Sequence, residues 1–380
     1  MVSIFICGDI VNYSHENGRI CTDELANIIS QADYSVCNFE APIGGYGKPQ
    51  PKSGPHHYQR KETIKGLKEQ GFDHLLLANN HTMDYGFEGL QATINEIEKQ
   101  GLDYSGAGFS YQMAYKTFIK NINNIRIGIV NAAEAALLFG VLDYYNNDNA
   151  GHAWINNSLI DKNIIRLKKE CDFVIIFSHA GLEHYPIPQK EWRERYKHLC
   201  DLGADVVVGS HPHVPQGYEK YDDSLIFYSL GNFYFDSVRY IDKEDRSFSV
   251  WLDLDRGKPP KFKTVYHYKK NGLVNLAPID KQVNLQKLCS LLGKKYSNIH
   301  DAMSLEAYEK IKRNLTLSLI PFPYDGNLKT SVRGLVSRLL GKRRKIDKTV
   351  LLLHLFKNEA YYYAAKHALE ILAREKHARK

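Results

Sequence analysis

Residues 203–219 read GADVVVGSHPHVPQGYE, and this stretch joins a run of apolar residues to a pair of histidines. The segment Asp205–Gly209 carries three consecutive valines, which is typical of a strand that is buried on both faces of a sheet. His211 and His213 follow directly where this strand is predicted to end. The same order, an apolar run and then polar side chains, recurs through roughly the first 240 residues and predicts a layered α/β fold.

Short apolar runs alternate with helical patterns on both sides of this stretch. The predicted strands are Val2–Cys7, Tyr34–Phe39, Asp73–Ala78, Ile125–Asn131, Asp172–Ser178, Asp205–Gly209 and Ser224–Ser229. The predicted helices are Thr22–Gln31, Lys61–Gln70, Phe87–Gln100, Ser158–Glu170 and Glu191–Leu202. Strands that alternate with helices in this way form parallel sheets with helices on their faces.

The pattern changes after this region. Phe248–Leu254 and Lys261–Tyr268 alternate between apolar and polar residues, which predicts a hairpin with one solvated face. Further helices are predicted over Asn284–Tyr296, Asp301–Asn314 and Thr349–Arg374. We therefore expect a main domain at residues 1–270 and a mostly helical, basic C-terminal extension at residues 271–380.

The composition is that of an ordinary globular protein. Of 380 residues, 43% are hydrophobic and 24% are charged, which excludes a disordered or collagen-like chain. No apolar run approaches the roughly 20 residues that span a bilayer, and the N-terminal segment lacks the basic region and cleavage site of a secretory signal. We therefore expect a cytoplasmic protein. The six cysteines have no C-x-x-C spacing, so we interpret them as free thiols rather than disulfides or zinc ligands.

Basic residues are concentrated in the tail. Residues 327–380 contain 14 Lys or Arg against 4 Asp or Glu, a net charge of +10, so the rest of the chain carries −3 of the total +7. Within the tail, GLVSRLLGKRRKIDK (334–348) sets an apolar stripe that includes Leu335 and Leu339 beside a basic cluster. Such a stripe is typical of packed core, or alternatively of peripheral contact with the inner face of a membrane or with a membrane-bound synthase. Nucleic acid is not expected as a partner, because the main body is slightly acidic.

Polar side chains close five of the predicted strands. They are Asp9, Asn38 and Glu40, Asn79 to His81, His179, and the pair His211 and His213. Open α/β sheets bind ligands at the carboxyl ends of their strands, so these side chains should converge. Carboxylates, amide oxygens and imidazoles together suit a borderline divalent metal such as zinc, manganese or iron. Each residue alone is more typical of a helix cap or a loop, and the prediction of a metal site depends on their joint occurrence.

The His-Pro-His spacing adds a second argument. Two histidines at i and i+2, bent by Pro212, can reach two metals a few ångströms apart, and a carboxylate can bridge the two ions. This arrangement is that of a two-metal hydrolytic site.

These residues belong to a longer series of blocks. GD (8–9), NFEAP (38–42), ANNHTMDYGFEGLQAT (78–93), GAG (106–108), SHAGLEHY (178–185), GADVVVGSHPHVPQGYE and FYSLGNFYFD (227–236) occur in this order. The chain resembles the CapA-like proteins of poly-γ-glutamate capsule synthesis, which are similar to the calcineurin-like metallophosphoesterases. The resemblance covers roughly residues 1–240, and it implies a layered αββα domain to which the C-terminal helices are an extension.

The resemblance also implies a role for each matching position. His81 corresponds to the acid near the leaving group, and two divalent ions (Mn, Zn or Fe) are implied. The bridging carboxylate should come from the second predicted strand, where Asn38 and Glu40 project from the same face, and Glu40 is preferred because a bridge between two cations calls for charge. The catalytic set is then His81, Asp9 and Glu40. The metal set is Asp9, Asn38, Glu40, Asn80, His179, His211 and His213.

The sequence departs from the superfamily pattern at one important position. Metallophosphoesterases usually carry a histidine two residues after the first aspartate, and Val11 occupies that position here. One metal site is then short of a ligand, which leaves three alternatives: a weak site, a site filled only with substrate, or a site completed by His15.

A basic loop, Lys48–Arg60, is either a solvated surface loop or an anion-binding lid. In the second interpretation four of its side chains hold a phosphate or carboxylate of the substrate. Two residues that follow His179 are expected in the same cleft. The predicted substrate-binding residues are Lys52, His56, His57, Arg60, Glu183 and His184.

Two functions of different classes follow. The first is a metal-dependent hydrolase of the phosphoesterase type, with a metal-bound hydroxide as nucleophile, acting on an anionic small molecule or polymer in capsule or cell-surface polymer biosynthesis; amide or γ-glutamyl hydrolysis is the variant chemistry. The second is a non-catalytic or weakly catalytic accessory component that binds an anionic polymer or a membrane-bound synthase. The retained His81 favours the first, whereas Val11 and the basic tail favour the second.

Overall fold

Strand β1 (Val2–Val11) lies in the middle of the larger sheet. It runs parallel to β2 (Tyr34–Phe39) on one side and antiparallel to β15 (Arg246–Leu254) on the other. The sheet order is β17-β16-β15-β1-β2-β3-β4, and β14 (Asn232–Phe235) pairs with the end of β1. The outer strands are β3 (His74–Leu76), β4 (Asp103–Ser105), β16 (Lys261–Lys270) and β17 (Leu273–Leu276). Strands β15 and β16 confirm the predicted hairpin.

A second sheet has the order β12-β13-β11-β10-β7-β6. Its central strands β7, β10, β11 and β13 are mutually parallel, and β12 and β6 add antiparallel edges. The bounds are β6 (Phe118–Ile122), β7 (Ile125–Ala133), β10 (Phe173–His179), β11 (Val206–Ser210), β12 (Tyr218–Tyr221) and β13 (Ser224–Phe227). A small third sheet joins β5 (Ala107–Gly108), β8 (Val141–Leu142) and β9 (Gly151–Ala153), next to the short helix α4 (Tyr111–Ala114).

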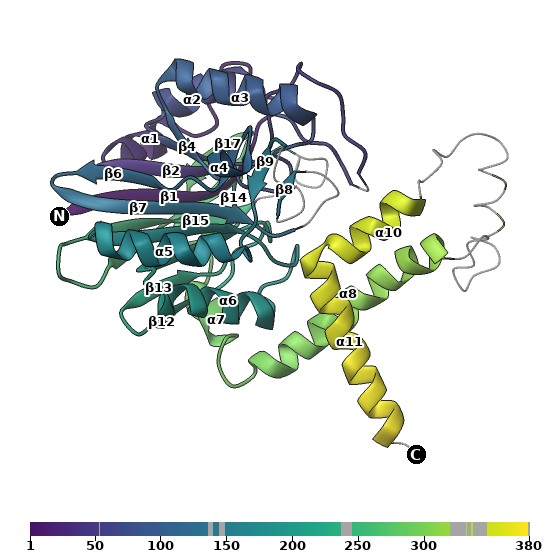
Figure 1. Cartoon of the computed structure of the whole chain (residues 1–380). Helices are drawn as coiled ribbons and strands as arrows, with labels where there is room; N and C mark the ends of the chain where they lie inside the picture. The colour runs from purple at the N-terminus through teal and green to yellow at the C-terminus, as the bar shows by residue number, and fades with distance from the viewer. Residues whose placement is uncertain are drawn as a thin grey trace. The chain divides into compact units, whose positions relative to one another are not determined.

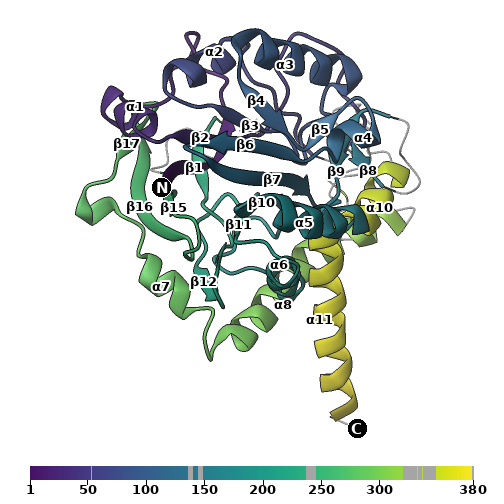
Figure 2. The same ribbon diagram turned by 60° about the vertical axis from the view of Figure 1, so that its left-hand side comes forward.

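Helices cover the outer face of each sheet, as Figure 1 and Figure 2 show. On the larger sheet these are α1 (Asp23–Ser30), α2 (Glu62–Glu69) and α3 (Gly86–Gln100), and on the second they are α5 (Ser158–Glu170) and α6 (Lys190–Asp201). The residues of β1 show why: Phe5 and Cys7 enter the apolar cluster beneath α1–α3, whereas Ile4 and Ile6 enter the cluster between the two sheets. Because both faces of β1 are buried, the strand is apolar throughout. The predicted layered αββα architecture is confirmed.

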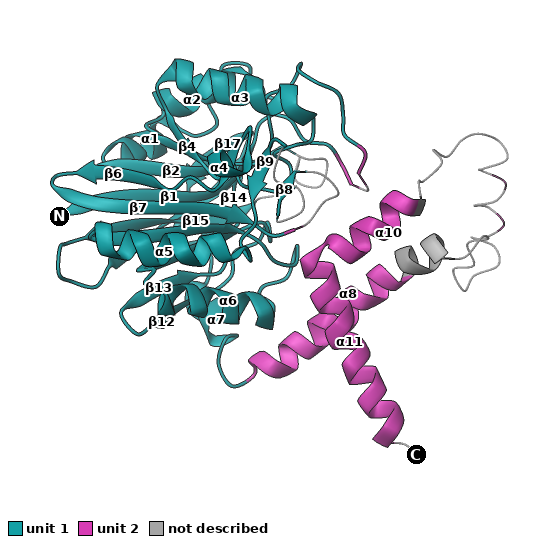
Figure 3. Cartoon of the chain, viewed as in Figure 1, with its two compact units in different colours: residues 1–50, 56–134, 139–294 teal, residues 51–55, 135–138, 295–380 magenta. Residues whose placement is uncertain are grey.

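The structure, a computed structural model, describes residues 1–52, 54–135, 140–143, 149–236, 245–319, 332, 336 and 348–378. It divides into two compact units, coloured separately in Figure 3. The first comprises residues 1–50, 56–134 and 139–294, and the second comprises residues 51–55, 135–138 and 295–380.

The boundary between the units differs from the predicted one at residue 270. Strand β17 pairs with β16, and Thr22 donates its backbone N–H to the carbonyl of Val274 at 3.0 Å. Helix α7 (Leu285–Ser290) is anchored too, since the backbone N–H of Tyr218 donates to Cys289 Sγ at 3.4 Å. These bonds hold the segment after 270 in the first unit, which therefore continues to Lys294.

The second unit contains α8 (Tyr296–Leu319), α10 (Lys348–Lys357) and α11 (Glu359–Ala378), which confirms a helical C-terminal region. The single helix predicted over 349–374 is wrong: Asn358 separates α10 from α11, and its side-chain oxygen accepts a hydrogen bond from the backbone N–H of Tyr361 at 2.7 Å. Asn at such a position is a helix cap. The predicted stripe with Leu335 and Leu339 lies outside the described residues. Among the described helices, none combines the length and apolar character needed to cross a membrane.

Candidate metal centre

The polar residues of the predicted site lie where parallel strands of both sheets end. Asp9 is inside β1 rather than after it, at an irregularity in the strand's pairing with β2 and β14. At this point β1 lies against the segment that precedes β14, since a Cβ added to Gly8 would lie 1.8 Å from the carbonyl oxygen of Gly231. Glycine is therefore required at position 8, and the backbone there places the buried Asp9 carboxylate among the histidines of the second sheet.

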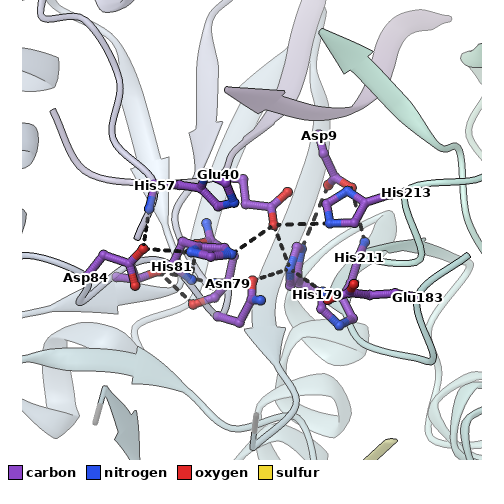
Figure 4. Close-up of polar contacts among 12 residues, drawn as sticks. Asp9, Glu40, His57, Asn79, His81, Asp84, His179, Glu183, His211 and His213 are labelled. Carbon is purple, nitrogen blue, oxygen red and sulfur yellow. Dashed lines mark hydrogen bonds and ion pairs between the residues drawn. The ribbon is translucent and has the colours of Figure 1, made fainter. Parts of the chain in front are cut away.

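Glu40, fully buried, is the central carboxylate of the cluster (Figure 4). Its Oε1 lies 3.6 Å from Nε2 of His179, 3.8 Å from Nε2 of His213 and 3.9 Å from Nε2 of His81. One carboxylate oxygen is thus approached by three imidazole nitrogens, each just beyond hydrogen-bond distance.

The remaining donors divide into two groups that share Glu40. Asp9, Glu40 and His213 form one group, in which Asp9 Oδ2 lies 3.5 Å from Nδ1 of His213. Glu40, His179 and His211 form the other, in which Nδ1 of His211 lies 3.1 Å from Nε2 of His179. Asn80 belongs with the second group, because its Oδ1 lies 2.9 Å from the same His179 nitrogen.

Asn38 makes a different contact from the one predicted. Its amide nitrogen donates to Asp9 Oδ1 at 2.7 Å and lies 3.1 Å from Nδ1 of His179. The side chain therefore holds the aspartate and the histidine together across the two sheets. This geometry supports Glu40 rather than Asn38 as the ligand that the two groups share.

Burial sets the protonation of the cluster. Burial holds the pKa of His179 well below its usual value, and the neighbouring rings of His211 and His213 lower it further. Burial also lowers the pKa of His211 to about 4. Both imidazoles are therefore neutral near pH 7, which is the form that binds a metal. Burial raises the pKa of Asp9, and His213 and the Asn38 amide oppose that rise.

Two buried supports of the histidines were not predicted from the sequence. Glu134 follows β7, and its Oε1 lies 3.6 Å from Nε2 of His211 while Oε2 accepts the Gly181 N–H at 3.0 Å. On the other histidine, Nδ1 of His213 lies 2.9 Å from Oδ1 of Asn232, whose amide nitrogen donates to Asp245 at 2.7 Å. A signal for Glu134 was present, because it follows the carboxyl end of an apolar strand like the predicted ligands.

A histidine–aspartate pair borders the cluster. Nδ1 of His81 lies 2.7 Å from Asp84 Oδ2, so the other ring nitrogen, Nε2, faces Glu40. Asp84 is itself fixed by the backbone N–H of His57, which donates to the same oxygen at 2.6 Å. The His57 ring lies against that of His81, with centroids 4.3 Å apart. These contacts hold the His81 imidazole in one orientation.

The loop predicted as an anion-binding lid contributes His57 to these contacts, and the His57 side chain is 8% exposed. Nε2 of His56 lies 2.6 Å from the Gln50 carbonyl, and Arg60 donates to the Tyr13 carbonyl at 2.6 Å. These bonds hold the loop, and the predicted roles of His56 and Arg60 in substrate binding stay predictions.

Lys52 belongs to the second compact unit and not to the unit that holds the cluster. Its predicted role in substrate binding stays a prediction.

Glu183, predicted to bind substrate, lies beside the two histidines of the His-Pro-His turn. A carboxylate oxygen of Glu183 and ring nitrogens of His211 and His213 all lie within 4.8 Å of one another, so Glu183 is a further candidate ligand. His184 follows it and donates its backbone N–H to the Pro212 carbonyl at 2.8 Å. This bond ties the loop after β10 to the His-Pro-His turn.

That turn is strained. His211 and His213 adopt backbone φ angles of 95° and 57°, a region that side chains other than glycine rarely enter. Such strain persists where the surrounding structure imposes it, and it is concentrated at functional sites.

Val11 is buried in the core, and the first group accordingly contains three donors, Asp9, Glu40 and His213. His15 does not match its proposed role as the replacement. Its Nε2 lies 2.7 Å from the carbonyl of Gly272, and its ring packs against Tyr234.

The donor chemistry fits a pair of divalent transition ions. Zinc-type ions bind imidazole and carboxylate at about 2.0–2.2 Å, which places ligands of one ion roughly 3–3.5 Å apart. In the second group, Nε2 of His179 lies 3.1 Å from Nδ1 of His211 and 3.6 Å from Oε1 of Glu40, and in the first group Nε2 of His213 lies 3.8 Å from Oε1 of Glu40; these separations are close to that range. A buried set of neutral imidazoles and carboxylates also suits borderline metals better than Mg²⁺ or Ca²⁺.

The family model described as "Bacterial capsule synthesis protein PGA_cap" matches residues 4–237, well over half of the chain. The chain belongs to this family. The matched region holds the PGA_cap strands and turns that carry every donor described above, and it ends at the FYSLGNFYFD block.

Named relatives are found in several bacteria. The chain is 32% identical over 249 residues to "Capsule biosynthesis protein CapA" of Bacillus anthracis, a match covering 62% of this chain and 60% of the relative. It is 33% identical over 258 residues to "PGA biosynthesis protein CapA" of Bacillus subtilis, covering 67% and 63%. A "Probable polyglutamine synthesis accessory protein" of Mycobacterium tuberculosis is 26% identical, covering 53% and 55%. The chain thus matches less than two thirds of the length of each.

A solved structure described as a novel phosphatase from Mycoplasma pneumoniae aligns with a TM-score of 0.45 and 16% identity, covering 78% of this chain and 98% of that one. A putative 5'-nucleotidase from Staphylococcus aureus aligns with a TM-score of 0.43 and 12% identity, covering 76% and 58%. Likeness at this level has no bearing on activity.

Proposed function

We propose that this PGA_cap protein is a metal-dependent hydrolase of capsule or cell-surface polymer biosynthesis. One observation carries the proposal: a His81–Asp84 pair points its second ring nitrogen, Nε2, at Glu40, the carboxylate shared by two groups of buried metal-ligand side chains. A purely structural cluster has no need of an oriented acid beside it.

Each group would hold one divalent ion. Asp9, Glu40 and His213 would hold the first, and Glu40, Asn80, His179 and His211 would hold the second. When bound, such ions polarise a phosphoryl or acyl oxygen and lower the pKa of water. Glu134 and Asn232 orient the two His-Pro-His rings, which keeps their ligand nitrogens aimed into the cluster.

His81 is assigned the proton transfer. When His81 is protonated, its Nδ1–H is held by Asp84 and its Nε2–H points towards the cluster. The Asp84 carboxylate stabilises this imidazolium. The proton passes from Nε2 to the departing oxygen or nitrogen of the substrate. His57, through its backbone bond to Asp84, keeps this pair from rotating.

The substrate class is an anionic polymer or a small anionic ester. The relative named for PGA biosynthesis, together with the resemblance to proteins of poly-γ-glutamate capsule synthesis, directs attention to a polyglutamate chain, and therefore to amide or γ-glutamyl cleavage beside phosphoester cleavage. A single experiment addresses both: the purified full chain, loaded with Mn²⁺ or Zn²⁺, is assayed against phosphoesters and poly-γ-glutamate. Turnover that is lost in His81→Ala while metal content is retained supports the proposal, and absence of turnover on both substrate classes contradicts it.

An accessory role is the second candidate, because Val11 leaves the first group with three donors. In this role the protein would bind an anionic polymer or a membrane-bound synthase without turning it over. Binding of poly-γ-glutamate that is unchanged in His81→Ala, together with no hydrolysis by the metal-loaded wild type, would favour this role.

A further inference from the structure

A second cluster of metal-ligand side chains lies in the helical unit, outside the region matched by the family. Helix α8 contributes His300 and Asp301, and α11 contributes His367. The two helices pack closely because α11 presents small residues to the interface: Ala360, Ala364 and Ala368 are 0–2% exposed. His367 lies one turn from Ala364 and next to Ala368, so the same face that packs also carries the imidazole.

The three side chains converge on one carboxylate oxygen. Nε2 of His367 lies 2.7 Å from Asp301 Oδ1, and Nδ1 of His300 lies 3.9 Å from that oxygen. The two imidazole rings meet edge to face, with centroids 4.7 Å apart. One ligand atom from each residue lies within 4.8 Å of the other two.

We propose that His300, Asp301 and His367 form a second divalent transition-metal site that joins α8 to α11. Both imidazoles face the same oxygen of Asp301, and His300 does so from a position that is 1% exposed. Two nitrogens and a carboxylate oxygen form a donor set for Zn²⁺, Co²⁺, Ni²⁺ or Fe²⁺ rather than for Mg²⁺ or Ca²⁺.

Access and coordination number are consistent with this site. The Asp301 side chain is 40% exposed and that of His367 is 18% exposed, so an ion can enter from solvent on this side. The same opening admits a water molecule as the fourth ligand of a tetrahedral ion. Because ligands of one ion are roughly 3–3.5 Å apart, binding requires His367 and Asp301 to separate slightly and His300 to approach.

The site is tested in the full chain with the sheet-edge cluster disabled. In a His211→Ala, His213→Ala background, zinc binding is measured by titration calorimetry with Zn²⁺ alone. We expect one Zn²⁺ per chain to remain bound. Adding His367→Gln to this background should lower the affinity for Zn²⁺ by at least about 100-fold, because loss of a ligand should cost at least as much as the roughly 10–100-fold that loss of an outer-shell partner costs. His377→Gln is the matched control, since His377 is an exposed histidine on the same helix and should leave binding unchanged.

Asp301→Asn provides a second variant that leaves both imidazole rings in place, and helix content of each apo variant is checked by circular dichroism. A chain that binds no Zn²⁺ in the His211→Ala, His213→Ala background overturns the proposal. Zinc binding that survives both His367→Gln and Asp301→Asn overturns it too, and so does equal loss in His377→Gln. The background separates this test from that of the proposed hydrolase.

Discussion

Replacing Asp84 by Asn removes the charge that orients and stabilises His81 while conserving the size of the side chain. Asp84 and His81 are 2% and 6% exposed, and their 2.7 Å contact is formed by a carboxylate oxygen and an imidazole nitrogen. Two unit charges about 4 Å apart, at an effective dielectric constant near 20, interact by about 4 kcal/mol. Because this stabilisation is present only when His81 is protonated, its loss lowers the fraction of His81 that carries the proton, and with it the rate, by at most about 10³-fold.

We therefore expect Asp84→Asn to lower kcat by about 10²–10³-fold for an alkyl phosphoester, whose leaving oxygen needs a proton. The loss should shrink to less than about 10-fold for a nitrophenyl ester, because nitrophenolate leaves without protonation. Metal content should stay at the wild-type value. Asp73→Asn is the matched control. Asp73 lies just before β3, at the end of the strand that points away from the cluster, and accepts the Ser35 N–H at 2.8 Å.

Equal losses for the two esters would refute the assignment of His81 as the acid. A fall in metal content in Asp84→Asn would show instead that the pair organises the ligands. Thermal unfolding of both variants separates these effects from general destabilisation, since Asp84 also accepts the His57 N–H.

Three further outcomes follow from other contacts. Glu134→Gln should weaken metal binding by about 10–100-fold, measured by competition with a chelator, because Glu134 orients His211; unchanged affinity would contradict that role. Gly8→Ala should lower the free energy of unfolding by about 3 kcal/mol in a denaturant titration, whereas Gly54→Ala, which meets no atom within 4 Å, should be close to neutral. Burial lowers the pKa of His267 to about 3 from about 6.5 in the unfolded chain, so its neutral form stabilises the fold above pH 6.5 and that contribution is lost as pH falls towards 3. At pH 5 the loss is about 2 kcal/mol, and His267→Gln should reduce the difference in unfolding free energy between pH 7 and pH 5 by that amount.

The layered domain could be predicted because its strands are buried on both faces. Apolar runs such as Phe173–His179 stand out against amphipathic helices such as Ser158–Glu170, whose bounds were predicted as the structure has them. Short strands were missed where the sequence carries little apolar signal: β4, for example, is Asp103–Ser105. The extent of β1 was also missed, because Gly8-Asp9 reads as a turn in sequence and becomes strand only through the close approach of Gly231.

The candidate site could be predicted to the level of residue sets, and its internal roles could not. The rule that parallel strands end at one edge brought Asp9, Glu40 and the histidines together. Which side chain holds which depends on contacts between the two sheets, such as the Asn38 amide between Asp9 and His179, and no local pattern encodes them. The contacts of Arg60 could not be predicted for the same reason, since positive charge does not reveal that its guanidinium donates to the backbone carbonyl of Tyr13.

A metal centre at the edge of the two sheets is tested by the metal content of the purified full chain after incubation with Mn²⁺ or Zn²⁺ and removal of free ions. We expect bound transition metal that is reduced by Glu40→Gln, because Glu40 is shared by both groups, and that is retained in His81→Ala. Neither change should affect metal bound at the helical cluster of His300, Asp301 and His367. The metal content of the His211→Ala, His213→Ala variant measures that contribution and is subtracted from each value. A metal content that is the same in wild type, Glu40→Gln and the His211→Ala, His213→Ala variant would contradict a metal centre at the edge of the two sheets.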